Sequence, residues 1–136
     1  MKIHSYNVDI FYEDTDSSGF TYHTSYLRFA ERARSKLVKE RFPELIEKME
    51  KNIFFFVVKE INVEFFTPSF LNDELTVNTF FIKSKSASID LNQIVLRGEM
   101  KICKIFVRLV WINGKSKKPS RIPKKIIDRF NNTEIV

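Results

Sequence analysis

The sequence changes its periodicity once, from a helix-type segment to four strand-type segments that are joined by very short connections. Apolar residues recur at helical spacing from position 24, and this pattern predicts a helix of about 15 residues. Strand-type runs follow at 53–66, 75–83, 88–97 and 101–112. Parallel neighbours need a crossover of about a dozen residues. The short connections therefore predict antiparallel pairing, which limits the fold more than any other feature.

A fifth strand is expected before the helix, because apolar and polar residues alternate over positions 6–12. Either Thr24 or Ser25 is expected to cap the start of the helix. Shorter helical segments are predicted at 43–49 and 123–130. The fold class is therefore α+β: a five-stranded antiparallel sheet wrapped around one long helix.

Length and apolar content favour one domain that spans residues 1–136. Phe54–Phe56, Phe65–Phe66 and Phe80–Phe81 place apolar side chains on both faces of their strands. A single helix covers only one face of a sheet. We therefore predict that a second copy covers the rest, in a homodimer or homotetramer.

The net charge of +6 is concentrated near the end of the chain. Six basic residues and no acidic one lie between Lys115 and Lys125, within a tail that we take as 115–136. Such a run is either solvated or a contact for a phosphate-bearing partner, such as coenzyme A, an acidic carrier protein, anionic lipid or nucleic acid. No helix with a basic recognition face accompanies the tail, so nucleic acid is not an expected partner.

Several classes of protein are excluded by composition. The single cysteine, Cys103, rules out an internal disulfide and a multi-cysteine zinc site, and its apolar strand indicates core packing. Two histidines are too few for a histidine-based metal cage, so no metal is expected. The longest apolar run, 53–58, is far shorter than the ~20 residues of a membrane span. A cytoplasmic protein without a transmembrane segment or signal peptide is expected.

The chemistry is expected between positions 12 and 23, where three carboxylates are followed by Gly19 and His23 at the mouth of the helix. Gly19 can adopt a positive φ and let the backbone approach a ligand. A purely structural loop is the simpler alternative. An EF-hand-like calcium loop begins here too, but its twelfth position would be Ser25 instead of glutamate.

The segment Tyr12–Arg34, YEDTDSSGFTYHTSYLRFAERAR, resembles the signature of the YbgC-type branch of the hydroxybenzoyl-CoA thioesterase family. The resemblance continues through the long strand before Pro68, the Asn-Asp-Glu-Leu-Thr turn at 72–76 and the Arg-Ile-Pro of the tail. It implies a hotdog fold and hydrolysis of acyl-CoA thioesters in dimers or tetramers, with the active site between two subunits. No cofactor is expected, since coenzyme A enters as part of the substrate.

The catalytic carboxylate of that motif falls on Asp16, as a nucleophile or as a general base on water. The backbone N–H of His23, at the amino end of the helix, is expected to polarise the thioester carbonyl. For Glu13 and Asp14 we favour a role in shaping the loop. Ser17 and Ser18 depart from the family pattern, which often has a small residue and glycines after the aspartate.

Substrate contacts are expected from Gly19 and Tyr22, and from Lys83 and Lys85 near the place where some relatives bind coenzyme A phosphates. Only these two residues are basic there, so the tail or an acyl carrier protein remains open as the alternative. A hotdog subunit that binds acyl groups or proteins without turnover is the alternative to an enzyme.

Overall fold

The computed structural model describes residues 1–132. Its elements are β1 (Lys2–Asp9), a 3-10 turn η1 (Tyr12–Asp14), α1 (Ser25–Arg41), α2 (Pro43–Glu50), β2 (Phe54–Phe65), β3 (Glu74–Ser84), β4 (Ser88–Arg97), β5 (Met100–Asn113) and α3 (Lys124–Asn132). The predicted order of one strand, one long helix and four further strands is confirmed.

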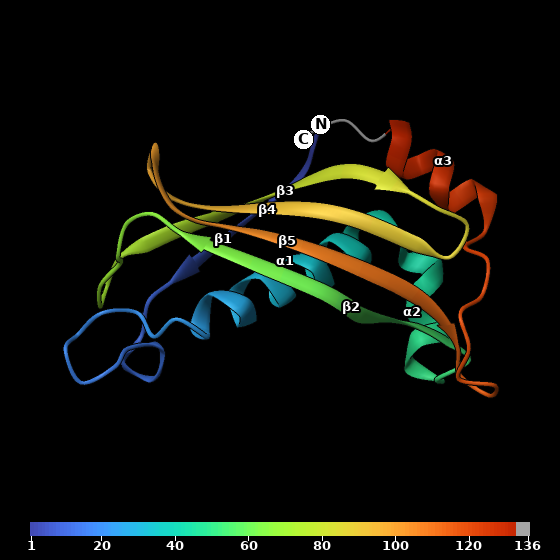
Figure 1. Cartoon of the computed structure of the whole chain (residues 1–136), viewed down its shortest axis with the longest axis horizontal. Helices are drawn as coiled ribbons and strands as arrows, with labels where there is room; N and C mark the ends of the chain where they lie inside the picture. Colours follow the sequence, from blue (N-terminus) through green and yellow to red (C-terminus); the bar gives the residue numbers. More distant parts are fainter. Residues whose placement is uncertain (133–136) are drawn as a thin grey trace.

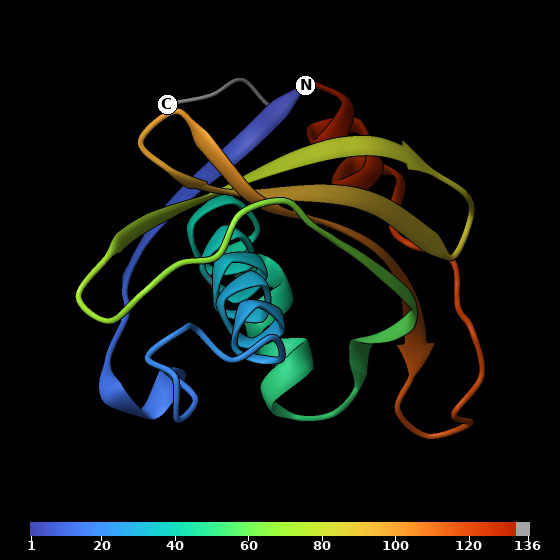
Figure 2. The same cartoon turned by 60° about the vertical axis from the view of Figure 1, so that its left-hand side comes forward.

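The five strands form one sheet in the order β1-β3-β4-β5-β2, and every neighbouring pair is antiparallel. The sheet arches over α1, which lies against its concave face (Figure 2). The α+β prediction of a five-stranded antiparallel sheet around one helix is therefore confirmed. β1 and β2 are the two edge strands.

α1 packs on the sheet through an apolar stripe at helical spacing that includes Tyr26, Phe29, Ala33 and Leu37, all of which are buried. The predicted side-chain cap is wrong. Thr24 has helical backbone angles and makes no capping bond, whereas a capping residue normally takes extended angles. Ser25 turns its hydroxyl back to donate to the Asp14 carbonyl at 3.0 Å.

The core is divided between the two ends of α1. One cluster packs around Leu37, Phe42 and Trp111, and α2 and α3 close it. The other cluster, around Tyr26 and Phe29, lies under the amino end of the helix. Figure 1 shows α3 at the end of the molecule away from the loop that joins β1 to α1.

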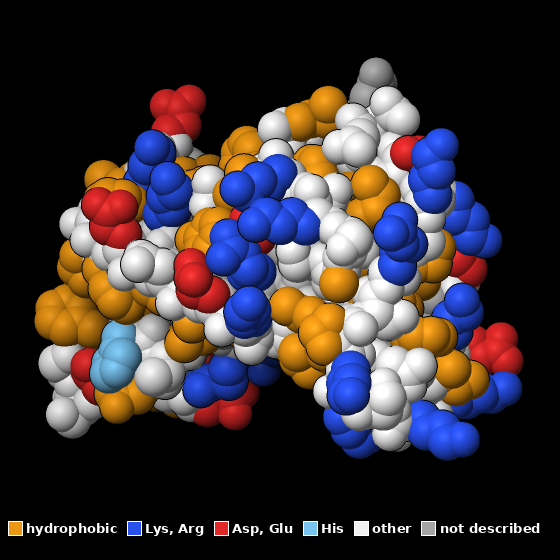
Figure 3. All heavy atoms as spheres, turned by 45° about the vertical axis from the view of Figure 1, so that its right-hand side comes forward, with side chains coloured by type: hydrophobic (Ala, Val, Ile, Leu, Met, Phe, Trp, Pro, Cys, Tyr) orange, Lys and Arg blue, Asp and Glu red, His pale blue; other side chains and the backbone are white. Residues whose placement is uncertain are grey.

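The basic segment after β5 is anchored through its backbone. The Ser120 N–H donates to the Trp111 carbonyl, and the Ile122 N–H donates to the Ser86 carbonyl, both at 2.8 Å. The lysine side chains of this segment are exposed. Figure 3 shows Lys and Arg side chains interspersed with apolar patches on the face that it presents. Residues 133–136 of the predicted tail lie outside the described residues.

The edge strand β2 leaves large apolar side chains uncovered. Val58 is 47% exposed, Ile61 39% and Phe65 53%. An exposed apolar edge strand is a template for pairing with another chain. Among residues 1–132, no helix is both long and apolar enough to cross a bilayer.

Candidate active site

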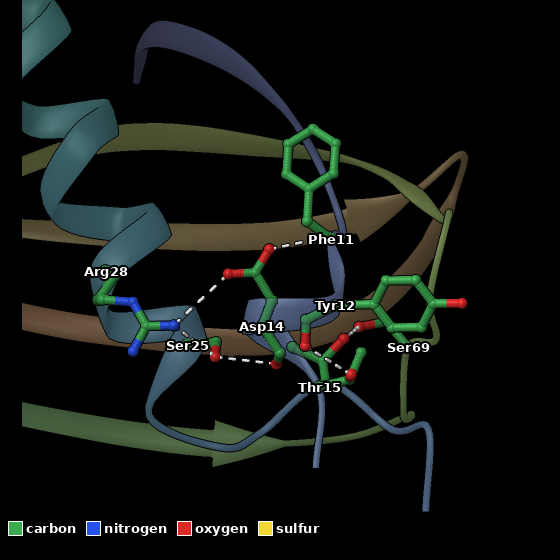
Figure 4. Close-up of polar contacts among 8 residues, drawn as sticks. Phe11, Tyr12, Asp14, Thr15, Ser25, Arg28 and Ser69 are labelled. Atoms are coloured by element: carbon green, nitrogen blue, oxygen red, sulfur yellow. Dashed lines mark hydrogen bonds and ion pairs between the residues drawn. The ribbon is translucent and has the colours of Figure 1, made fainter. Parts of the chain in front are cut away.

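The loop between β1 and α1 is fixed from within by Asp14, whose side chain is buried. Its carboxylate accepts the Phe11 N–H at 2.9 Å and an Arg28 N–H at 3.5 Å (Figure 4). Its carbonyl accepts the Tyr22 N–H at 2.8 Å and the Ser25 hydroxyl. Asp14 therefore shapes the loop, as expected, and its carboxylate is not turned toward solvent.

Asp16 lies two residues further on, at the start of a tight turn. Its N–H donates to the Phe20 carbonyl at 2.8 Å, and Gly19 closes the turn with the expected positive φ of 87°. No atom lies within 4 Å of the place where a Gly19 Cβ would be. The glycine is required here for its backbone conformation and not for lack of space.

The Asp16 carboxylate is exposed and accepts hydrogen bonds from its own turn. Its Oδ1 accepts the Ser18 N–H at 2.8 Å and the Ser18 hydroxyl. The bond from the Ser18 hydroxyl, then that from the Ser18 N–H and a smaller one from the Phe20 backbone lower the pKa of the Asp16 carboxyl below its ordinary value. Asp16 thus presents an ionised carboxylate at the surface of the loop.

The two sides of the loop pair with each other and with the connection between β2 and β3. Thr15 pairs with Thr21, and Phe20 pairs with Phe70. The Thr21 N–H donates to the Ser69 carbonyl at 2.8 Å. This pairing brings the Asp16 turn back beside the residues that open α1.

The amino end of α1 offers a free backbone donor. Ser25 and Leu27 direct their N–H groups to the carbonyls of Tyr22 and Thr24. The His23 N–H donates no hydrogen bond within residues 1–132. An unpaired N–H at the positive end of a helix suits a developing oxyanion. The exposed His23 ring packs against Tyr22, with centroids 4.4 Å apart.

A hollow of about 290 Å³ opens beside His23. Its walls are mainly apolar and come from the loop, from α1 and from the end of β2: Phe20, Thr21, His23, Tyr26, Phe65, Phe66, Thr67 and Pro68. A larger hollow of about 460 Å³ lies along the outer side of α1 and α2. His23 lines only the smaller hollow, and Asp16 lines neither, so we place the candidate site at the smaller one on the position of His23.

Of the four predicted substrate-binding residues, two lie near Asp16 and two lie far from it. Gly19 and Tyr22 belong to the same loop as Asp16. Lys83 and Lys85 lie at the opposite end of β3 from the segment that pairs with the loop, roughly 30 Å away at about 3.3 Å per residue. Within one chain the structure does not bring these lysines to Asp16. Lys83 and Lys85 instead lie near the Asp90 carboxylate.

Cys103 is fully buried in the core, as predicted, and burial raises the pKa of its thiol to about 12. Among residues 1–132, no three His, Cys, Asp or Glu side chains are grouped to share a metal ion.

The sequence did not reveal Ser69 or the segment Phe65–Pro68 as parts of the site. They reach it from more than 40 residues along the chain, because the end of β2 is placed by its pairing with β5. Pro68, which follows the predicted strand at 53–66, is a local signal for the end of that strand and not for a site. Outside the site, the sequence also did not reveal the buried Gln93, which accepts a hydrogen bond from Arg34 and donates one to the Ala30 carbonyl, each at 2.9 Å.

Comparison with known structures defines the class of fold. A 1,4-dihydroxy-2-naphthoyl-CoA thioesterase from Synechocystis superposes with a TM-score of 0.86 at 17% identity, over 95% of this chain and 96% of that one. A probable thioesterase from Bartonella henselae superposes with a TM-score of 0.80 at 31% identity, over 88% and 98%. The fold is the hotdog fold, as the resemblance implied.

The chain belongs to the thioesterase-like superfamily, whose family model matches residues 12–130. It is also similar to the acyl-CoA thioester hydrolase YbgC of Escherichia coli, with 31% identity over 124 residues, which cover 90% of this chain and 92% of the relative. The resemblance to the YbgC-type family is therefore confirmed.

Proposed function

We propose that this protein hydrolyses the thioester of an acyl-CoA to a free acid and coenzyme A, with Asp16 as the reacting carboxylate. The observation that carries the proposal is the arrangement of the loop. The exposed, ionised Asp16 carboxylate follows the buried Asp14 carboxylate, and the unpaired His23 N–H lies at the amino end of the adjoining helix. The family and the YbgC relatives support the same reaction class.

The reaction needs a nucleophile at the carbonyl carbon and hydrogen-bond donors at the carbonyl oxygen. The His23 N–H and the positive end of α1 supply the donor and the dipole. Asp16 attacks the carbon to give a mixed anhydride that water then cleaves, or it takes a proton from the attacking water. In both routes water adds across the C–S bond, and the thiolate leaves and is protonated.

Both routes need an ionised carboxylate, and Asp16 is ionised at neutral pH because its pKa is lowered from an ordinary value that is already acidic. The apolar hollow beside His23 is the proposed place for the part of the substrate next to the thioester. The positive φ of Gly19 lets the loop approach the substrate. The Tyr22 ring packs against the His23 ring at the rim of the hollow. No cofactor takes part in this scheme.

We further propose that the working unit is a homodimer that forms along β2. Its uncovered Val58, Ile61 and Phe65 need a partner, and Asp16 itself is open to solvent in one chain. A second copy would shield the carboxylate and could bring its own Lys83 and Lys85 toward the coenzyme A phosphates. Light scattering should give a mass of at least twice that of the chain, and a monomer at assay concentrations would contradict this proposal.

The test is thiol release from a panel of acyl-CoAs of different chain lengths. Replacing Asp16 by alanine should lower kcat by about 10² or more, the usual contribution of a positioned base or nucleophile. Glu13→Gln is the matched control, because Glu13 is an exposed carboxylate of the same loop. Equal turnover by wild type and Asp16→Ala would rule out Asp16 as the reacting carboxylate. Tight binding without turnover would point instead to an acyl-binding module.

The panel should include an acyl carrier protein loaded with the preferred acyl group. The exposed lysines after β5 are compatible with either a coenzyme A phosphate or an acidic carrier. We propose the cytosol as the compartment, since Cys103 is the single cysteine of the chain and allows no disulfide within it.

A further inference from the structure

Three hydroxyl groups meet behind the wall of the hollow beside His23. The Ser69 hydroxyl lies 2.7 Å from the Tyr26 hydroxyl and 2.6 Å from the Thr21 hydroxyl. All three residues are buried, with exposed fractions of 0%, 3% and 7% respectively. Ser69 is therefore the centre of a hydrogen-bonded chain that bulk solvent hardly reaches.

Each of the three hydroxyl groups comes from a different segment of the protein. Thr21 belongs to the loop that carries Asp16, and Tyr26 lies in the first turn of α1, next to the free His23 N–H. Ser69 lies in the connection between β2 and β3. The backbone repeats the link, because the Ser69 carbonyl accepts the Thr21 N–H at 2.8 Å. Ser69 thus joins the segment with the carboxylate to the segment with the oxyanion donor.

The three hydrogen-bonded hydroxyl groups lie next to the candidate site. Thr21 and Tyr26 line the same hollow as His23. A buried tyrosine hydroxyl needs a hydrogen-bond partner anywhere in a protein. Here the partner also fixes the two segments whose separation matters for the reaction. A displacement of about 1 Å between reacting groups can lower a rate by about 10²-fold.

We propose that Ser69 is a positioning residue for thioester hydrolysis, acting through Thr21 and Tyr26 to hold the Asp16 turn against the amino end of α1. The proposal rests on the function proposed above. Ser69 itself touches neither Asp16 nor His23 among its hydrogen-bond partners. Its effect should therefore fall on the rate of the chemical step more than on substrate binding.

The first experiment is Ser69→Ala, which removes one oxygen atom and leaves the backbone link intact. We expect kcat to fall by about 10- to 100-fold while KM changes little. Thr79→Val is the matched control, because Thr79 is also fully buried and its hydroxyl accepts from the Gln93 side chain at 3.1 Å, away from the hollow. It should lower the melting temperature without lowering kcat.

A second pair of variants keeps the test valid if Ser69→Ala folds poorly. Thr21→Ser retains the hydroxyl and should keep nearly the wild-type kcat, whereas Thr21→Val removes the hydroxyl and should lower kcat as Ser69→Ala does. A merely structural role would not separate kcat from stability in this way. Equal kcat in Thr21→Ser and Thr21→Val would overturn the proposal, as would a wild-type kcat in Ser69→Ala.

Hydrogen exchange separates this proposal from the proposed function, because it needs no turnover. The amides of Asp16 and Gly19, which are hydrogen-bonded within the turn, should exchange faster in Ser69→Ala than in wild type and be unchanged in Thr79→Val. Faster exchange supports the positioning role even if no acyl-CoA is hydrolysed. Unchanged exchange in Ser69→Ala overturns it, whatever the wild-type enzyme does.

Discussion

The two ends of α1 are built from different interactions. At the carboxyl end, Phe42 stacks on Phe130 with ring centroids 4.4 Å apart, and Trp111 is buried beneath α2 and α3. At the amino end, the buried Asp14 carboxylate and the Ser69 hydroxyl hold a loop that exposes Asp16 to solvent. One end is closed by apolar packing and the other is ordered by hydrogen bonds.

The two kinds of interaction have different roles: apolar packing stabilises the fold, and hydrogen bonds fix the positions of reactive groups. Apolar burial contributes roughly 25 cal/mol per Å² and is not directional. It therefore stabilises the carboxyl end without fixing any reactive group. Hydrogen bonds contribute less net free energy but impose distances and angles. Changes at the closed end should therefore reduce stability, whereas changes at the open end should reduce activity.

The largest expected effect on stability is at the closed end. Phe130→Ala removes an aromatic side chain that is 4% exposed and that stacks on both Phe42 and Phe81. The free energy of unfolding should fall by about 3–5 kcal/mol, as measured by urea denaturation. The kcat of the folded fraction should not change. A large fall in kcat would break the proposed separation of the two ends.

Glycines at the two ends give a smaller, paired test. A Cβ on Gly114 would lie 1.6 Å from the Asn52 carbonyl oxygen, so Gly114→Ala must displace backbone and should cost about 1–3 kcal/mol. Gly19 has open space around it but a φ of 87°, so Gly19→Ala should cost only about 1 kcal/mol. Gly19→Ala should nevertheless have the lower kcat. The reverse order of kcat values would contradict the comparison.

The smallest expected effect is on the titration of Asp16. Ser18→Ala removes the hydroxyl bond that contributes most to the lowered pKa, so the pKa of the Asp16 carboxyl should rise toward its ordinary value. The carboxylate would then be protonated at a higher pH, and the acid limb of the rate profile should move to higher pH. Carbon NMR titration of the carboxyl measures this. Ser17→Ala, which removes no bond to Asp16, should leave the titration unchanged.

Much of the fold could be predicted from periodicity, because a strand or helix with one buried face shows its period in the sequence. The run 88–97 matches β4 residue for residue. The first strand was predicted at 6–12 but spans Lys2–Asp9. Its limits are set by β3, whose pairing runs from Glu74, opposite Asp9, to Phe80, opposite Lys2. Local alternation could not reveal the extent of a partner strand.

The residues of the candidate site that lie close together in the sequence could be predicted, and those that come from distant segments could not. Asp16, Gly19 and His23 lie within eight positions, so one motif carries them all. Ser69 reaches them only through tertiary pairing and carries no local signature. Lys83 and Lys85 were expected near the site by resemblance. The direction of β3 places them at its far end, so only a partner subunit could bring them close.

The most direct test of the central claim is a crystal structure with an acyl-CoA analogue in which a methylene group replaces the thioester sulfur. We predict that the ketone oxygen lies about 2.7–3.1 Å from the His23 backbone nitrogen. The ketone carbon should lie about 3–3.5 Å from a carboxylate oxygen of Asp16. An analogue bound with its carbonyl group away from both residues, in a crystal that is active before soaking, would contradict the account.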